Sequence, residues 1–376
     1  MRSAVVLLLV PLCRASTNTT SRRLNASPSD RLRLEHPTLR KRSPSRASKG
    51  QISDEDKAEL LSAPSPSSAA VPARVALPPR KDAEAGAASS IPSFMYGTAW
   101  KEARTAMLAR LALDKGFSAL DTATAERHYS ERGVGDALRG PGAPGRDALF
   151  LQTKFTYPRG HEKGREPWAP TDGPEQRVTH SLDRALANLA QPAAGGYVDA
   201  LLLHGPSSEA RSRGLLSEED RATWRGLEAE LAAGRTRAIG VCNVDANLLR
   251  QLIDDAEAQP PMIVQNRCYA SSGWDYAVRR LCREHGIVYE GYSLLTANRR
   301  AIANPRGPIK KAAARLGVTD EAVVFRFAMQ LGIVPLTGTS SEEHMVQDRA
   351  AYGVELTAPE VAAIETCFLN NFVSAS

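Results

Sequence analysis

Cysteine is scarce in this chain, with five among 376 residues. None shows the spacing that is typical of a disulfide framework or a metal site, so no metal is expected. This scarcity disfavours secretion and predicts buried thiols in a reducing compartment. The cysteines are Cys13, Cys242, Cys268, Cys282 and Cys367.

Long apolar runs are also missing near the amino terminus. The apolar stretch Ala4–Leu12 is about half as long as the roughly 20 residues that a membrane-spanning helix needs. Because Arg2 precedes it and Ala15 and Ser16 follow it, residues 1–17 are expected to be a removable targeting signal. The mature form is therefore expected to have no membrane segment.

Residues 18–71 form the next segment, which is rich in Arg, Ser, Pro and Ala. We interpret it as a transit-like, disordered linker. A signal followed by a transit-like segment favours a plastid destination, with the mitochondrion and the secretory pathway as alternatives. Residues 72–376 are assigned to one folded domain.

The net charge of +6 is unevenly distributed along the chain. Residues 1–50 hold 11 Lys and Arg against two acidic residues, which leaves 37 basic and 40 acidic residues beyond residue 50. The body of the protein is therefore slightly acidic, and no nucleic-acid surface is expected.

From residue 91 onward, short β-rich runs alternate with amphipathic helical stretches. Eight such units favour a closed (β/α)8 TIM barrel of the α/β class, preceded by a disordered extension. No Gly-x-Gly-x-x-Gly follows the first run, which disfavours the dinucleotide fold with that fingerprint. The expected strands are Phe94–Thr98, Ser118–Asp121, Ala148–Lys154, Val198–His204, Ala238–Val241, Ile263–Asn266, Ile287–Tyr292 and Ile333–Leu336.

Ionisable residues end three successive predicted strands: Asp121, Lys154 and His204. Tyr129 lies in the loop after the second strand. Catalytic groups of such barrels gather at the carboxyl ends of the strands. Each residue also has a structural alternative: a helix cap for Asp121, a solvated charge for Lys154, and a loop histidine for His204. His128 is an alternative to Tyr129.

Together these groups suit proton delivery to a carbonyl oxygen. A free tyrosine is a poor acid at neutral pH, and a nearby ammonium group such as Lys154 lowers its pKa. Asp121 would hold Lys154, and a neutral His204 would orient the carbonyl oxygen. The electrons would come from a hydride cofactor.

The chain resembles the aldo-keto reductases over residues 91–370. The resemblance rests on residues 97–100 (GTAW), 116–123 (GFSALDTA), 131–138, 153–154, 198–206 (VDALLLHGP), 237–243, 265–266 and 291–293. It implies that Tyr129 is the general acid and that Asp121, Lys154 and His204 support it.

The same resemblance implies a nicotinamide cofactor, NADPH with NADH as the alternative, and a small carbonyl substrate. Asn243 and Gln265 would hold the carboxamide, and Tyr292 would stack on the ring. A monomer is expected. The full set of implied cofactor-binding residues is Gly97, Thr98, Cys242, Asn243, Gln265, Tyr292, Ser293, Gly338, Thr339 and His344.

The sequence departs from the family pattern at three places. Tyr129 lies eight residues after Asp121 where five is usual, so the loop at 124–128 must bulge. After the eighth strand, the basic residues that grip a 2′-phosphate are missing, and His344 takes the place of an arginine. Few residues follow the last expected helix, Pro359–Phe368, so the substrate pocket is expected to be open.

Two other functions remain as alternatives. One is a nucleotide-binding sensor or scaffold that keeps the barrel but turns over poorly. The other is a barrel enzyme of different chemistry, such as a lyase.

Overall fold

The computed structural model describes residues 52–63, 71–81, 90–191 and 195–369. The expected targeting signal at 1–17, and the part of the transit-like segment before residue 52, lie outside the described residues and stay predictions. Within the described ranges, no helix is both long enough and apolar enough to cross a membrane.

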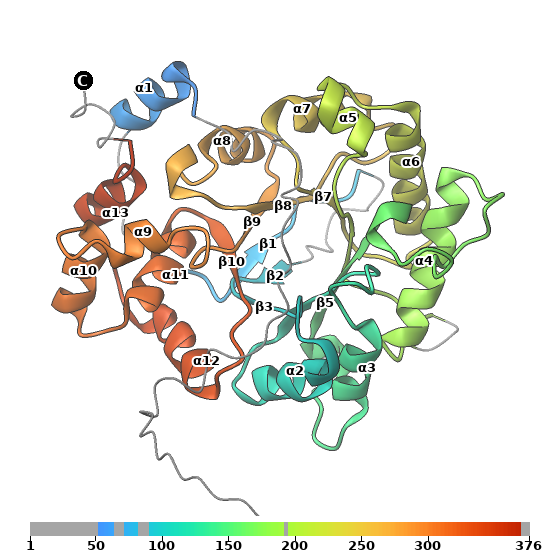
Figure 1. Ribbon diagram of the computed structural model, residues 1–376, viewed down its shortest axis with the longest axis horizontal. Helices are drawn as coiled ribbons and strands as arrows, with labels where there is room; N and C mark the ends of the chain where they lie inside the picture. Colours follow the sequence, from blue (N-terminus) through green and yellow to red (C-terminus); the bar gives the residue numbers. More distant parts are fainter. Residues whose placement is uncertain (1–51, 64–70, 82–89, 192–194, 370–376) are drawn as a thin grey trace, which may run out of the picture. The chain divides into compact units, whose positions relative to one another are not determined.

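Eight parallel strands close into a barrel, in which the last strand pairs with the first (Figure 1). This confirms the predicted (β/α)8 class, and each predicted strand overlaps one in the structure. The strands are β3 (Met95–Gly97), β4 (Ala119–Asp121), β5 (Phe150–Phe155), β6 (Ala200–Leu203), β7 (Ile239–Cys242), β8 (Ile263–Arg267), β9 (Val288–Tyr292) and β10 (Ile333–Thr337).

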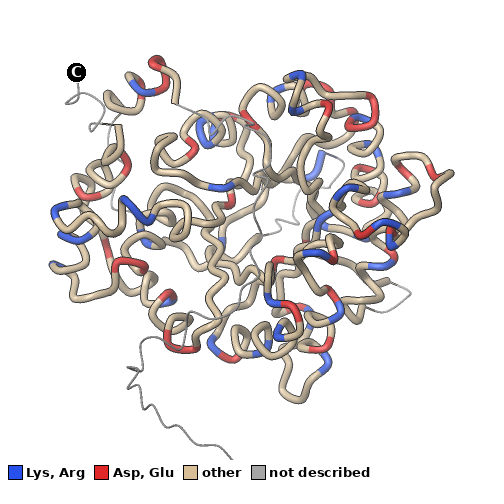
Figure 2. The backbone as a smooth tube through the Cα atoms, in the orientation of Figure 1, with Lys and Arg blue, Asp and Glu red and all other residues tan. Residues whose placement is uncertain are grey.

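Helices surround the barrel, and basic and acidic residues are interspersed along them (Figure 2). A capping box between Ser217 and Asp220 opens one helix. The helices are α2 (Thr105–Asp114), α3 (Glu131–Arg139), α4 (Pro174–Asn188), α5 (Ser208–Arg213), α6 (Glu218–Ala232), α7 (Ala246–Asp255), α8 (Tyr276–Glu284), α9 (Arg299–Ala303), α10 (Pro308–Leu316), α11 (Asp320–Gln330), α12 (Glu342–Arg349) and α13 (Ala358–Glu365).

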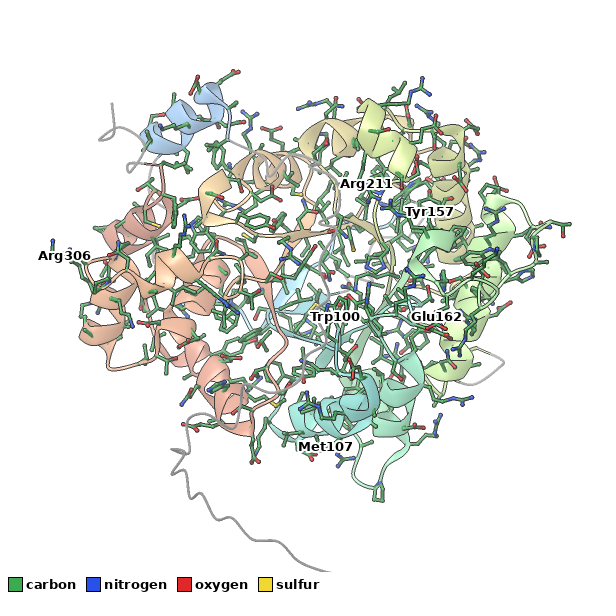
Figure 3. All side chains as sticks on the ribbon, viewed as in Figure 1. Trp100, Met107, Tyr157, Glu162, Arg211 and Arg306 are labelled. Atoms are coloured by element: carbon green, nitrogen blue, oxygen red, sulfur yellow. The ribbon has the colours of Figure 1, made fainter. Side chains whose placement is uncertain are left out.

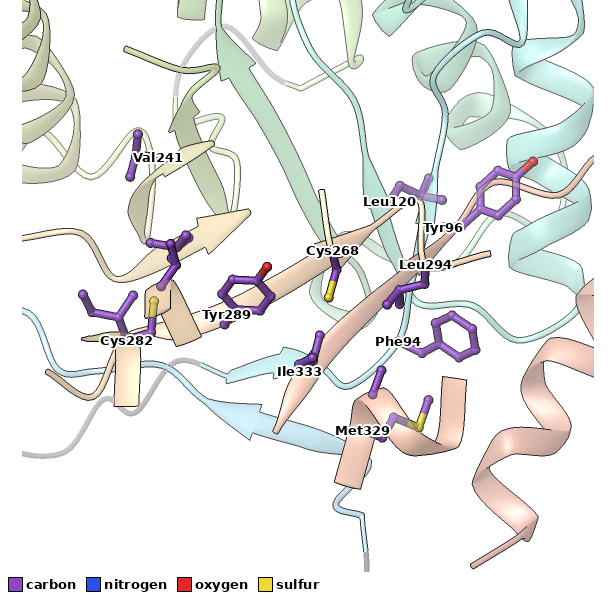
Figure 4. Packing of buried hydrophobic residues seen from close by; sticks show 14 of the residues in the cluster. Phe94, Tyr96, Leu120, Val241, Cys268, Cys282, Tyr289, Leu294, Met329 and Ile333 are labelled. Carbon is purple, nitrogen blue, oxygen red and sulfur yellow. The ribbon is translucent and has the colours of Figure 1, made fainter. Parts of the chain in front are cut away.

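Alternation along the strands divides the core into two layers. Outward residues such as Tyr289 and Ile333 pack toward the helices, where Met329 of α11 meets them (Figure 4). Inward residues such as Phe150 and Val288 fill the barrel near the amino-terminal ends of the strands. Because successive side chains of a strand point to opposite faces, the residues two and four positions further on also point inward. The carboxyl-terminal half of the barrel is therefore lined by a different set of side chains.

A short hairpin closes the amino-terminal end of the barrel. Its strands are β1 (Arg74–Ala76) and β2 (Ser90–Pro92), which pair antiparallel. Leu77 and Ile91 from this hairpin join the apolar cluster inside the barrel. The hairpin thus keeps water away from the amino-terminal end of the barrel, and the carboxyl-terminal end stays open to a ligand.

The structure corrects the predicted linker at 18–71, because part of it is a helix. Helix α1 (Asp54–Ser62) is capped by Ser53, and Leu60 packs with Tyr276 of α8. Arg280 of α8 donates to Glu59 at 2.6 Å. A nine-residue helix with a single buried side chain has almost no amphipathic period, so the sequence pattern could not reveal it. Helix α1 and the barrel fall within one compact unit.

Gly240 in β7 tests how tightly the barrel is packed. A Cβ there would lie 2.3 Å from the carbonyl oxygen of Ile263 and 2.6 Å from Leu202. Gly240→Ala is therefore expected to lower the free energy of unfolding by about 3 kcal/mol, measured by chemical denaturation. Gly145→Ala is the control, because nothing lies within 4 Å of its Cβ position. Equal stability of the two variants would contradict the packing described.

Candidate active site

A cleft of about 670 Å³ opens at the carboxyl-terminal end of the barrel. Trp100, which lines it, lies inside the ring of helices (Figure 3). The lining includes Gly97, Trp100, Lys101, Asp121, His128, Tyr129, His204, Asn243, Gln265, Arg267, Tyr292, Ser293, Phe325, Gly338, Thr339 and His344. Most residues predicted for the site therefore meet around one cleft.

Asp121 and Lys154 form a buried ion pair at the ends of β4 and β5. The Lys154 Nζ donates to Asp121 Oδ1 at 2.5 Å and to the carbonyl oxygen of Thr122 at 2.9 Å. Burial opposes the charge on Lys154, but the neighbouring groups, Asp121 first among them, together outweigh burial and raise the pKa of Lys154 above its ordinary value. Lys154 is 1% exposed and stays charged behind the wall of the cleft.

Tyr129 reaches the cleft because the loop at 124–128 folds into a tight turn. The amides of His128 and Tyr129 both donate to the carbonyl oxygen of Ala125, at 3.0 and 3.1 Å. The Trp100 amide donates to the carbonyl oxygen of His128 at 2.7 Å. These bonds place the Tyr129 ring with its centroid 5.2 Å from the Lys154 Nζ. The three extra residues therefore bulge as the sequence required.

Burial reverses the net pKa shift expected for Tyr129. From the sequence, the nearby ammonium group is expected to lower this pKa. In the structure burial raises the pKa of Tyr129 above its ordinary value, and Lys154 offsets only part of that rise. Tyr129 is therefore held in its protonated form.

His204 follows β6 and faces Tyr129, with 5.9 Å between the ring centroids. Its Nδ1 is 2.7 Å from the Thr156 hydroxyl oxygen. Burial, helped by the positive charge of Lys154, lowers the pKa of His204 to about 3. The neutral imidazole that the sequence argument required is therefore present, and Nε2 is the ring nitrogen left for a molecule in the cleft.

Two of the expected cofactor residues lie behind the cleft rather than on its wall. The Thr98 hydroxyl donates to the carbonyl oxygen of Asp121 at 2.9 Å, which ties β3 to β4. Cys242 is 1% exposed, and burial raises the pKa of its thiol well above the ordinary value. Their side chains support the wall and do not face the cavity.

Asn243 and Tyr292 hold each other at the cleft. The Tyr292 hydroxyl donates to Asn243 Oδ1 at 2.5 Å, and Asn243 Nδ2 donates to the carbonyl oxygen of His204 at 2.8 Å. This leaves Asn243 with one amide hydrogen that neither bond uses. The position of the Tyr292 ring is thus fixed before any ligand enters.

Two basic residues on the cleft wall, Lys101 and Arg267, were not predicted from the sequence. The Lys101 Nζ donates to the carbonyl oxygen of Gly338, and the Arg267 guanidinium lies 5.4 Å from the centroid of the Tyr292 ring. Arg267 is two residues after Gln265 in β8, so strand alternation could have placed it on the inner face. Lys101 has no such signal, because it follows the end of β3 in an irregular turn.

The sequence model of the aldo/keto reductase family matches residues 94–368. The chain belongs to the aldo/keto reductase family. Its relatives in the family include 2,5-diketo-D-gluconic acid reductase B of Corynebacterium sp., at 30% identity over 72% of this chain and 85% of the relative. The NADPH-dependent alpha-keto amide reductase of Saccharomyces cerevisiae is 26% identical over 66% of this chain and 74% of its own length.

Solved structures support the fold of this aldo/keto reductase. The crystal structure of an aldo/keto reductase from Brucella melitensis superposes with a TM-score of 0.62, covering 79% of this chain and 99% of that one. At 23% sequence identity this likeness concerns the fold alone.

His204 provides a test of the site's electrostatics. Because its pKa is lowered to about 3, the imidazole is expected to stay neutral across roughly pH 5 to 8, where an ordinary histidine titrates. NMR of the ring nitrogens measures this, and the spectrum of His204→Gln assigns the signal. A titration midpoint near the ordinary value would contradict the burial described.

Proposed function

We propose that the chain reduces the carbonyl group of small aldehydes or ketones to an alcohol with a reduced nicotinamide dinucleotide, preferring NADPH. The observation that carries this proposal is the meeting of Tyr129, His204 and the Asp121–Lys154 pair at one cleft. The names of the relatives support it, since they describe reductases of a diketo acid and of alpha-keto amides.

The residues of the cleft fit the cofactor chemically. Tyr292 offers an aromatic face, and Asn243 and Gln265 offer amide groups to a carboxamide. Gln265 keeps its Oε1 as an acceptor, and the Cys242 thiol lies 3.8 Å from it. Lys101 and Arg267 offer positive charge to phosphates. When bound, the reduced nicotinamide supplies a hydride for the carbonyl carbon.

The chain's own residues then handle the proton. Tyr129 holds it at neutral pH because burial raises the phenol's pKa, and donates it to the carbonyl oxygen. The ammonium group of Lys154 stabilises the phenolate that results, and Asp121 keeps that ammonium in place. The neutral His204 orients the carbonyl oxygen through its remaining ring nitrogen.

Tyr129→Phe tests the assignment of the acid. Removing the hydroxyl is expected to lower kcat at least about 100-fold, because general acid catalysis contributes on this scale. NADPH oxidation with a panel of aldehydes and ketones measures the rate. The Kd for NADPH should be unchanged, because Tyr129 donates no proton to the nucleotide.

Tyr197→Phe is the matched control, since the Tyr197 hydroxyl is 3.4 Å from Asp147 at the surface. Equal rates for Tyr129→Phe and the wild-type protein would rule out Tyr129 as the acid. Tight nucleotide binding without turnover of any carbonyl by the wild type would favour a sensor or scaffold.

The cofactor preference depends on the segment around α12. His344 is exposed at the first turn of this helix, beside Glu342 and Glu343. Without the missing cations, NADPH is expected to bind less than about tenfold more tightly than NADH, since one charge-assisted hydrogen bond accounts for at least that ratio.

His344→Arg is expected to raise the ratio of the two Kd values about tenfold, measured by fluorescence titration of the full chain. His180→Arg on α4 is the control, because His180 is exposed and does not line the cleft. An unchanged ratio in His344→Arg would place the 2′-phosphate elsewhere.

A further inference from the structure

Glu290 is a carboxyl group buried inside the barrel, and the proposed reaction does not use it directly. It lies in β9, two residues before Tyr292, and is 0% exposed. Its Oε2 accepts from Nε2 of Gln152 and from Nε2 of Gln265, each at 2.7 Å. The carboxyl is therefore fixed from two strands, β5 and β8.

The same two amides also hold Asp121. Gln152 Nε2 donates to Asp121 Oδ1 at 2.9 Å, and Gln265 Nε2 donates to the same oxygen at 3.0 Å. Each amide nitrogen has two hydrogens, so one serves each carboxyl group. Glu290 and Asp121 are thus joined by a double bridge, and the Lys154 ammonium closes the network on Asp121.

The unsatisfied atoms of the network indicate that Glu290 carries a proton. Within the described residues, Glu290 Oε1 and Gln152 Oε1 are buried and have no hydrogen-bond partner. Two buried acceptors without a donor are costly, and a protonated carboxyl supplies an O–H that an ionised one lacks.

The electrostatics around Glu290 agree with a protonated carboxyl. Burial, together with the charge of Asp121, raises the pKa of Glu290 to about 7, while Gln152, Gln265 and Lys154 act in the opposite direction. Among the described residues, the Cys242 thiol also faces this interior, and burial keeps it neutral.

We propose that Glu290 is a positioning residue that holds a proton beneath the ion pair and, through Gln152 and Gln265, keeps Asp121 and Lys154 in the arrangement that supports Tyr129. This role rests on the proposed function, in which Tyr129 ends as a phenolate beside Lys154. An ionised Glu290 adds a negative charge that acts on Asp121 and Lys154, and so weakens the support that the ammonium group gives to the phenolate. The neutral form does not.

The sign of the pH dependence follows from this role. Reduction is supported while Glu290 is protonated, so kcat should fall as the pH rises through about 7. Between about pH 6 and pH 8 the expected fall is on the order of tenfold for one group that titrates. Because the pKa of Glu290 is raised on folding, the wild-type protein should also lose stability as the pH rises from the ordinary carboxyl range to about 7.

Glu290→Gln in the full chain tests the proposal, because glutamine keeps the shape and cannot ionise. The fall of kcat near pH 7 should disappear in this variant. The loss of stability, followed by the denaturation midpoint against pH, should become smaller but should not vanish, because Glu131 also has a raised pKa. Glu131→Gln is the control. Glu131 is a second buried carboxyl, with its pKa raised to about 7, but it accepts from Thr153 outside this network. This control should keep the wild-type fall in kcat.

A second variant tests the proposal if Glu290→Gln does not fold. Gln152→Met removes one donor to Glu290, so the fall in kcat should move to higher pH. An unchanged pH profile of kcat in Glu290→Gln, or in Gln152→Met where the first variant does not fold, would overturn the proposal while leaving the reductase activity standing. A wild-type protein that reduces no carbonyl at any pH would instead overturn the proposed function, and this role with it.

Discussion

The buried ion pair of Asp121 and Lys154 is the interaction on which the rest of the site depends. Removing two charges from water costs several kcal/mol for each ion, and their attraction offsets this only when the remaining polar atoms are also hydrogen bonded. The strands meet that condition here. Three donors converge on Asp121 Oδ1, and the Thr122 carbonyl oxygen accepts from Lys154. The carboxyl-terminal half of the barrel is therefore lined by polar side chains, which satisfy the hydrogen bonds of the ion pair.

The order of side chains along each strand reflects the same constraint. In β5, Phe150 belongs to the apolar cluster at the lower end, Gln152 to the amide bridge and Lys154 to the ion pair. Successive inward residues thus pass from apolar to polar to charged toward the cleft. The hairpin beneath keeps water out of the apolar end, so the charges are desolvated from one side and open to a ligand on the other.

The fold could be predicted because buried parallel strands appear as short apolar runs, and because their carboxyl ends meet on one side. For the same reason Asp121, Lys154 and His204 could be placed together from their positions at strand ends. Gln152 and Glu290 could have been found by counting back two residues from Lys154 and Tyr292, which strand alternation puts on the same face. The sequence pattern does not single them out, because they lie inside the strands and not at the strand ends.

Other features depend on contacts that no local pattern encodes. Helix α1 is held by Arg280 and Tyr276, more than 200 residues further along the chain. The position of Tyr129 depends on backbone bonds of its loop to Ala125 and Trp100. The net pKa shift of Tyr129 could not be predicted either, because the burial that outweighs Lys154 is a property of the closed fold.

Burial has opposite consequences for the protonated and the ionised forms of Tyr129. This explains why Tyr129, Lys154, Asp121 and Glu290 are linked in one network. The desolvation that keeps Tyr129 protonated also destabilises the phenolate that it must become. The positive charge of Lys154 offsets part of this destabilisation, and Asp121 is the first of the groups that keep Lys154 charged. Asp121 in turn shares two amide groups with Glu290. A change of charge at any of these four residues therefore reaches the others, so their substitutions should not act additively.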